Sequence, residues 1–307
     1  MAVANSLVKS KSGKPQTFGA FLTTDAIKTK INSMIGEKDG QRFITSIISA
    51  VSTNPTLAEC DHSTILAAAM LGESLKLSPS PQLGQYYLVP FNDKRRNVKV
   101  AQFQLGYKGY IQLAIRSGEY KKLNVLAIKE GELIRFDPLN EEIEVNLVED
   151  DTVRESLPTI GYYAMFEYTN GFKKAMYWSK DKMLAHADKY SMAFSAEKYR
   201  DLQAGKIPQS DMWKYSSFWY RDFDSMAYKT LLRQLISKWG IMSIDMQKAM
   251  DGDMAAINED GSVDYVDNIP DAEPVMSVND PQTKDIAVDT STGEVVDADP
   301  TAVFFEG

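Results

Sequence analysis

Apolar residues recur at helical spacing over the first quarter of the chain. This period predicts helices over residues 24–34 (closed by Gly36), 41–52 (stopped by Asn54-Pro55) and 61–77 (capped by Asp61 or Ser63). No residue type in these helices suggests chemistry. We therefore expect them to provide scaffold or contacts between subunits.

The pattern changes from helical spacing to β-type sequence after the Pro-containing residues 78–81. A β-rich composition predicts a strand over 85–91, and alternation predicts a second strand over 98–104, with a polar turn between them. Residues 106–117 are predicted to form a helix that follows the second strand at once. Further strands are predicted over 120–128, 132–136, 143–148, 159–168 and 172–178. The last two flank Asn170-Gly171, a strong hairpin signal. Residues 149–157 are expected to form an acidic loop.

The remaining apolar patterns predict two more helices with a polar, mobile segment before the second. The first helix follows a cap at Ser179 or Asp181 and ends near Tyr190, and residues 191–211 form the mobile segment. The second helix spans about 224–239 and carries an apolar face formed by Met226, Leu231, Leu232, Leu235, Ile236 and Trp239. The fold class expected from the whole pattern is α+β: a β-hairpin, a helix and an antiparallel sheet, packed with further helices.

Charge divides the chain more sharply than hydropathy does. The formal net charge is −8, yet residues 251–307 contain fifteen acids and one base, so they carry −14 and the first 250 residues carry +6. This asymmetry predicts four parts: a flexible basic arm over 1–20, helices over 21–78, a binding core over 79–250, and an acidic, largely disordered tail over 251–307 that could hold a partner motif.

Several function classes lack their signatures in this sequence. No apolar run approaches the ~20 residues that cross a bilayer, no signal peptide is evident, and the single Cys60 fits a reducing cytoplasm. No Walker or dinucleotide motif is present, and His62 and His186 have neither zinc-type nor triad-type neighbours. We therefore predict no cofactor, no metal, no membrane contact and no covalent catalysis.

Cations gather instead near aromatic residues, a pattern typical of single-strand nucleic-acid binding. We predict contacts from the hairpin tip, from the helix that begins after Gly106, from the mobile segment, and from a strip of the last helix (Arg221, Ser225, Lys229, Arg233). These parts would line one basic groove. The predicted DNA-binding residues are Lys94, Arg95, Arg96, Lys99, Gln104, Tyr107, Lys108, Gln112, Arg116, Lys198, Arg200, Lys206, Lys214, Tyr215, Arg221, Lys229, Arg233 and Lys238.

Two features within these parts have alternative interpretations. Gly106 and Gly109 leave the first helical turn open to a phosphate, or they serve close packing of the helix on the sheet. The rings of Tyr215, Phe218 and Trp219 support bases, or they belong to the core, which is the interpretation that we favour for Trp219.

Two sequence blocks resemble the RecT family of phage single-strand annealing proteins. The first is Gln104-x-Gly-Tyr-Lys-Gly109, preceded by Tyr86-Tyr-Leu-Val-Pro90, and the second is Phe223-x-x-Met226-x-x-Lys229-Thr-x-Leu232-Arg233, closing on Lys238-Trp239. The resemblance covers roughly residues 20–245. It implies a fold similar to that of the ring- and filament-forming annealing superfamily.

The resemblance also implies a function. Such a protein binds single-stranded DNA and anneals complementary strands without ATP, as a ring or helical filament that holds the annealed duplex. It works in the cytoplasm of a bacterial host, beside a 5′→3′ exonuclease and the host single-strand-binding protein. Two alternatives stay open: a metal-dependent nuclease with candidate ligands Asp93, Glu130, Glu132 and Asp137, and a passive single-strand-binding protein.

Overall fold

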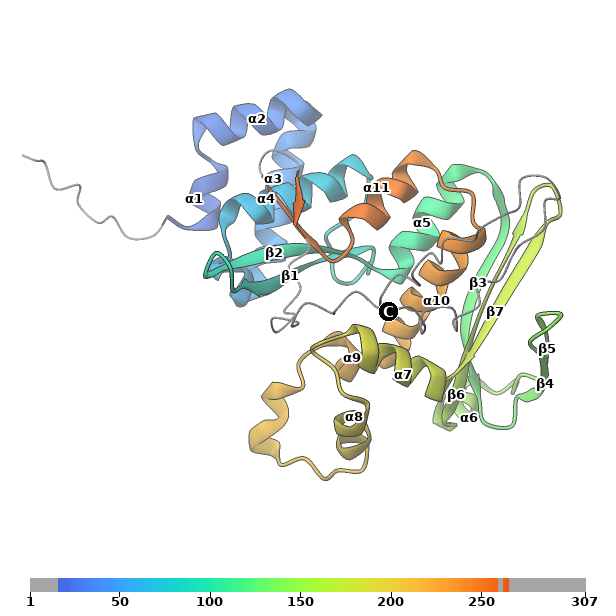
Figure 1. The fold of residues 1–307 in the computed structure, drawn as a ribbon. Helices are drawn as coiled ribbons and strands as arrows, with labels where there is room; N and C mark the ends of the chain where they lie inside the picture. The colour runs from blue at the N-terminus through green and yellow to red at the C-terminus, as the bar shows by residue number, and fades with distance from the viewer. Residues whose placement is uncertain (1–15, 259–261, 265–307) are drawn as a thin grey trace, which may run out of the picture. The chain divides into compact units, whose positions relative to one another are not determined.

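The computed structural model describes residues 16–258 and 262–264, and it combines helices with antiparallel sheets (Figure 1). The α+β prediction is confirmed. The helices are α1 (Phe18–Leu22), α2 (Asp25–Ile35), α3 (Glu37–Ser52), α4 (His62–Ser74), α5 (Tyr107–Ser117), α6 (Asp151–Ser156), α7 (Lys180–Tyr190), α8 (Ala196–Gln203), α9 (Phe218–Arg221), α10 (Phe223–Trp239) and α11 (Ile244–Gly252), with short 3-10 helices η1 (Pro55–Glu59) and η2 (Gln209–Lys214). The strands are β1 (Tyr86–Asp93), β2 (Val98–Leu105), β3 (Tyr120–Lys129), β4 (Leu133–Asp137), β5 (Glu142–Val145), β6 (Thr159–Tyr168), β7 (Lys173–Ser179), β8 (Ala255–Ile257) and β9 (Val263–Asp264).

The N-terminal helices pack as their apolar spacing predicts. The α3 positions Phe43, Ile44, Ile47 and Val51 are buried, and the Asp61 carboxylate caps α4 by accepting from the Ser63 N–H at 2.9 Å. The described structure begins inside the arm predicted over 1–20, because residues 18–20 already belong to α1, whereas residues 1–15 lie outside the described residues. The folded part therefore starts a few residues earlier than the sequence predicted.

The first sheet has the order β1-β2-β8-β9. Its hairpin runs in continuous register from Tyr86↔Leu105 to Asp93↔Val98, as the alternation predicts, and α4 covers it. On its other edge β2 pairs with β8, Phe103 opposite Ala255. Residue 250, the predicted start of the tail, lies inside α11, which continues to Gly252, and β8 and β9 belong to this sheet.

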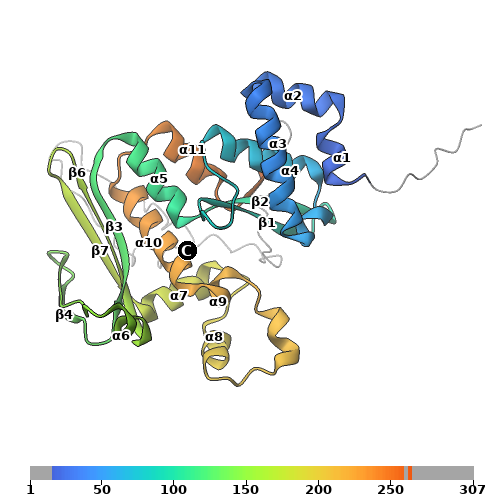
Figure 2. The same ribbon diagram turned by 180° about the vertical axis from the view of Figure 1, so that it is seen from behind.

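The second sheet has the order β3-β6-β7, and its helices lie on one face (Figures 1 and 2). The β6 side chains Tyr162, Ala164 and Phe166 point into this layer and are fully buried. They meet the predicted apolar face of α10, where Leu231, Leu232, Leu235 and Ile236 are also fully buried. Burying each such side chain contributes about 1.5–3 kcal/mol, so α10 is anchored by packing and not by its intrinsic helix propensity.

Two predicted loops contain helices. The acidic segment 149–157 holds α6, whose N-terminal amides are capped by Asp150. The segment 191–211, predicted to be mobile, contains α8 and the start of η2, because Ser195 caps α8 while Phe194 and Tyr199 are buried against the core. The sequence prediction missed the packing of these two aromatic residues because the segment around them is mostly polar.

Candidate nucleic-acid interface

Glycines at the start of α5 permit a close approach of backbone to backbone. A Cβ on Gly106 would collide with the Gly84 carbonyl oxygen, and one on Gly109 would collide with the Gln85 carbonyl oxygen. The Gly106 N–H also donates to Gln85 O at 2.8 Å. The packing interpretation of these two glycines is therefore confirmed, and their effect is to fix α5 against the entry of β1.

Aromatic rings join the start of α5 to α9 and α10. The Tyr87 ring of β1 lies 5.2 Å from the Phe218 ring of α9, and Tyr107 of α5 lies 5.5 Å from Tyr228 of α10. Tyr87 and Tyr107 are half-buried and Phe218 is exposed. Burial, together with the charge of Asp222, raises the pKa of Tyr87, which records how closely the start of α10 approaches β1.

Two exposed cations stand on the elements that meet here. Lys108 follows Tyr107 in the first turn of α5, with its side chain alongside Gly84, and Arg221 ends α9. Within the described residues neither has a carboxylate within salt-bridge distance, and both side chains are exposed to solvent. We call Tyr87, Tyr107, Lys108, Phe218 and Arg221 the α5–α9 site.

The exposed face of α5 continues from this site. Gln112 and Arg116 follow Lys108 at four-residue intervals, and all three are exposed, as the spacing predicts. The Arg116 guanidinium also donates to the Leu75 carbonyl oxygen at 2.5 Å, beyond the end of α4. Arg116 therefore has a structural contact, although its cation stays in solvent.

The tip of the β1–β2 hairpin is separate from the α5–α9 site. Eight residues of β2 lie between them, which is about 26 Å at 3.3 Å per residue. Arg96 pairs with the buried Asp93 at 2.6 Å and Lys99 pairs with Glu59, whereas Lys94 and Arg95 are exposed. The hairpin tip thus offers two solvent-facing cations.

The predicted strip along α10 does not exist as an exposed row. Arg221 belongs to α9, since the helix breaks at Asp222, and the Lys229 side chain is 8% exposed. Lys229 Nζ and Arg233 Nη1 each lie 2.8 Å from an oxygen of the buried Asp253. The assignment of Lys229 to phosphate contact is therefore wrong. Arg233 is 39% exposed, but its charge is paired with the same Asp253 carboxylate. Asp253 carried no local signal that could have revealed this.

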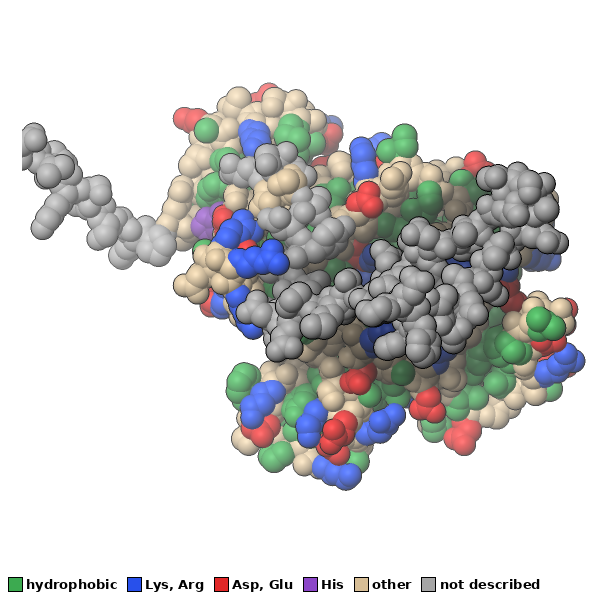
Figure 3. Space-filling view, in the orientation of Figure 1, with side chains coloured by type: hydrophobic (Ala, Val, Ile, Leu, Met, Phe, Trp, Pro, Cys, Tyr) green, Lys and Arg blue, Asp and Glu red, His purple; other side chains and the backbone are tan. Residues whose placement is uncertain are grey.

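Cations of the α8–η2 region are mostly paired with neighbouring acids. Lys198 and Lys206 share Asp201, at 3.5 and 3.6 Å. Lys214 pairs with Asp211 at 3.0 Å, and Figure 3 shows blue and red side chains interleaved over this part of the molecule. Arg200 is exposed. This region therefore presents a mixed surface and not a basic one.

The aromatic side chains of residues 212–223 are divided between the core and the surface. Trp219 is buried at 6% exposure, so the packing interpretation is confirmed for it, while Trp213 is 73% exposed. The Tyr215 ring packs edge-on against Tyr220 at 5.0 Å.

Two of the predicted polar contacts lie elsewhere. Lys238 sits 5.4 Å from the Trp239 ring, at the far end of α10 from the α5–α9 site. Gln104 is half-buried on β2 beside Gln102.

Three of the four carboxylates proposed for a nuclease have structural partners, and the fourth, Glu130, is exposed. Glu132 is fully buried and accepts from Arg154 Nε at 2.6 Å and from the N–H groups of Lys129 and Val148. Asp93 and Asp137 each accept backbone N–H groups of a turn. Among the described residues, no group of three or more His, Cys, Asp or Glu could hold a metal ion.

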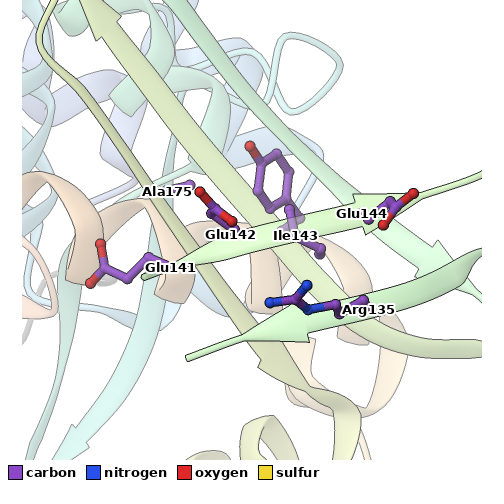
Figure 4. Close-up of a pocket in the computed structure, with 7 residues that line it drawn as sticks. Arg135, Glu141, Glu142, Ile143, Glu144 and Ala175 are labelled. Atoms are coloured by element: carbon purple, nitrogen blue, oxygen red, sulfur yellow. The ribbon is translucent and has the colours of Figure 1, made fainter. Parts of the chain in front are cut away.

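An open pocket beside the β4–β5 hairpin is acidic (Figure 4). Glu141, Glu142 and Glu144 line it together with Arg135, and Tyr163 and Ala175 form its floor on the sheet. Arg135 also pairs with Asp137 at 3.2 Å. The excess of acids makes this pocket unfavourable for a phosphate group.

Comparison with known proteins decides the family. The RecT family model matches residues 41–268, which include both sequence blocks and the β8 segment. The chain belongs to the RecT family. The uncharacterized protein YqaK of Bacillus subtilis (strain 168) is 34% identical over 291 residues, covering 92% of this chain and 88% of YqaK. Protein RecT of Escherichia coli (strain K12) is 26% identical over 216 residues, covering 69% and 71% of the two chains. No helix in the described part of this RecT family member is long and apolar enough to cross a membrane.

Proposed function

We propose that this protein binds single-stranded DNA and anneals it to a complementary strand in homologous recombination, without ATP and without covalent catalysis. The observation that carries the proposal is the match to the RecT family over residues 41–268. The α5–α9 site adds physical support, because two exposed cations lie on the helices that carry its partly exposed rings. Self-assembly, a cytoplasmic location and partnership with an exonuclease and a single-strand-binding protein belong to the same proposal.

Annealing requires neutralisation of the phosphate charges of the two strands and no making or breaking of covalent bonds. Lys108 and Arg221 lower the repulsion between two phosphate backbones, and the release of counterions drives their binding. The faces of Tyr87, Tyr107 and Phe218 support the strand while base edges stay free to pair. Lys94 and Arg95 contact the backbone farther along, since about 26 Å corresponds to roughly eight nucleotides at 3.4 Å each.

The proposal is tested by comparing two variants with the same loss of charge. Lys108→Gln/Arg221→Gln removes both cations of the α5–α9 site, and Lys28→Gln/Lys30→Gln removes two exposed cations of α2. For the first variant, the slope of log affinity against log salt should fall by about 1.4 for single-stranded DNA, at about 0.7 per phosphate. The control should keep the wild-type slope, and annealing of complementary oligonucleotides without nucleotide triphosphate should slow only in the first variant.

Three results would contradict the proposal. An equal salt dependence of DNA affinity in both variants would show that the α5–α9 site does not contact the DNA backbone. Protection of DNA without faster annealing would favour a passive binding protein. Cleavage of labelled oligonucleotide with Mg²⁺, lost in Asp93→Ala, would favour the nuclease.

A further inference from the structure

Three lysines surround one carboxylate on the β3–β6–β7 sheet, at the end near the β6–β7 turn. The Nζ atoms of Lys121, Lys122 and Lys173 lie 2.7, 3.7 and 3.6 Å from the oxygens of Glu167. The Glu167 side chain is 6% exposed, whereas the lysine side chains are 58–64% exposed. The ammonium groups are therefore gathered at a fixed point and remain open to solvent.

The strand register explains why consecutive lysines share a face. Lys122, Glu167 and Lys173 form one row across β3, β6 and β7. Between Tyr120 and Lys122 the register shifts, since two steps on β3 match one step from Tyr168 to Glu167 on β6. Lys121 is the extra residue of this bulge. A bulge re-aims a side chain that would otherwise point to the opposite face, and here it directs Lys121 to Glu167.

The cluster carries an excess of positive charge. Three ammonium groups share one carboxylate, which leaves two positive charges, and the exposed Glu119 is the nearby acid at the start of β3. Glu167 also restrains the lysine side chains, so these side chains lose less conformational entropy when an anion binds than unrestrained lysines would.

We propose that Lys121, Lys122 and Lys173 form a second contact for the phosphate backbone of single-stranded DNA, separate from the α5–α9 site. The cluster lies on the sheet face opposite α5 and α10, because Glu167 alternates with the core residues Phe166 and Tyr168. This inference rests on the proposed DNA-binding function. It gives each subunit two backbone contacts that face different sides of the sheet.

The chemistry of the surroundings favours a nucleic-acid backbone over an acidic protein segment. Protein interfaces need an apolar core, whereas phosphate contacts need only charge. The next row on this face is Asn124, Met165 and Ala175, which offers a single large apolar side chain, and Met165 is half-buried.

A triple variant and a matched control test the inference. Lys121→Gln/Lys122→Gln/Lys173→Gln removes the cluster, and Lys28→Gln/Lys30→Gln/Lys38→Gln removes the same charge from exposed positions of α2 and α3. Binding of an oligo-dT probe to the full chain is measured against salt. The two excess positive charges of the wild-type cluster can neutralise two phosphates, so losing the cluster should lower the slope by about 1.4, which corresponds to about 25-fold weaker binding at 0.1 M salt relative to a common 1 M reference. The control should retain the wild-type slope.

Glu167→Gln should act in the opposite direction. It raises the excess charge from two to three, so the slope should steepen by about 0.7 and binding at 0.1 M salt should tighten about fivefold. A folding defect weakens binding and cannot imitate this gain. If the triple variant and Glu167→Gln both bind like the control, the inference is wrong.

Two further comparisons separate the possible failures. If Lys108→Gln/Arg221→Gln changes the slope and the triple variant does not, the α5–α9 site stands and only the cluster fails. If both matter, their slope changes should add, because distant sites act independently. A triple variant that loses affinity for a poly-glutamate peptide but not for oligo-dT would overturn the inference and identify a docking surface for acidic protein.

Discussion

Replacing Asp253 should destabilise the whole fold, although the sequence places it in an acidic tail. Its carboxylate accepts hydrogen bonds from the Leu105 N–H at 2.9 Å, from Tyr110 Oη at 3.3 Å, and from Lys229 and Arg233 at 2.8 Å each. The carboxylate joins β2, α5 and α10 to the end of α11. Asp253→Ala removes all four contacts at once.

The magnitude follows from the burial of each partner. Lys229 is the main cost, because its side chain is 8% exposed and would keep an unpaired charge. Breaking a buried pair in this way costs about 3–5 kcal/mol. Arg233 is 39% exposed and can be hydrated, so it adds little. For a folded part of this size, the expected loss is about 6–20 °C in Tm.

Thermal and urea unfolding followed by circular dichroism would measure the effect. Asp245→Asn, an exposed acid of α11, is the control for lost charge and should shift Tm by less than 2 °C. Lys229→Met/Asp253→Asn should recover most of the stability, since it removes the charge as well as its partner. A Tm for Asp253→Ala within 2 °C of wild type would refute the reasoning.

Three other expectations concern the ends of the fold, its acid sensitivity and its tryptophans. A chain ended after residue 268 should keep wild-type unfolding and DNA binding, whereas one ended after residue 250 should unfold in circular dichroism, because it lacks Asp253 and β8. Burial raises the pKa of Glu132, but hydrogen bonds from Arg154 and two backbone N–H groups outweigh it and hold the pKa below its ordinary 4.5. The stability that the ionised Glu132 contributes is therefore present above pH 4.5 and is lost as the pH falls through its lower pKa in the folded protein. Glu132→Gln should reduce the fall of the urea unfolding midpoint between neutral and acidic pH, and an unchanged fall would count against this reasoning. Trp219→Ala should cost about 3–5 kcal/mol in urea unfolding and Trp213→Ala less than about 0.5, and the reverse order would contradict their burial.

Local pattern was a reliable guide wherever one face of an element is buried. The β-rich composition of 85–91 and the period of two over 98–104 placed β1, β2 and the turn between them, and a shift of β2 by one residue would expose Phe103 and Leu105. The apolar face of α10 followed from the period of 3.6 in the same way. The RecT family blocks lie on these same well-patterned elements.

The sequence by itself determined the elements that have a regular apolar period, the buried faces of those elements, the family and the supply of cations. Only the tertiary structure decided which cations are available to a ligand. Lys229 falls on a polar strip by spacing, yet a carboxylate 24 residues later neutralises it. Lys121 and Lys122 should point to opposite faces, yet a bulge gathers both at Glu167. The physical reason is the same in both cases. Charge pairing acts through space between residues that are distant in the chain, whereas the period of apolar residues can be read from neighbouring positions in the sequence.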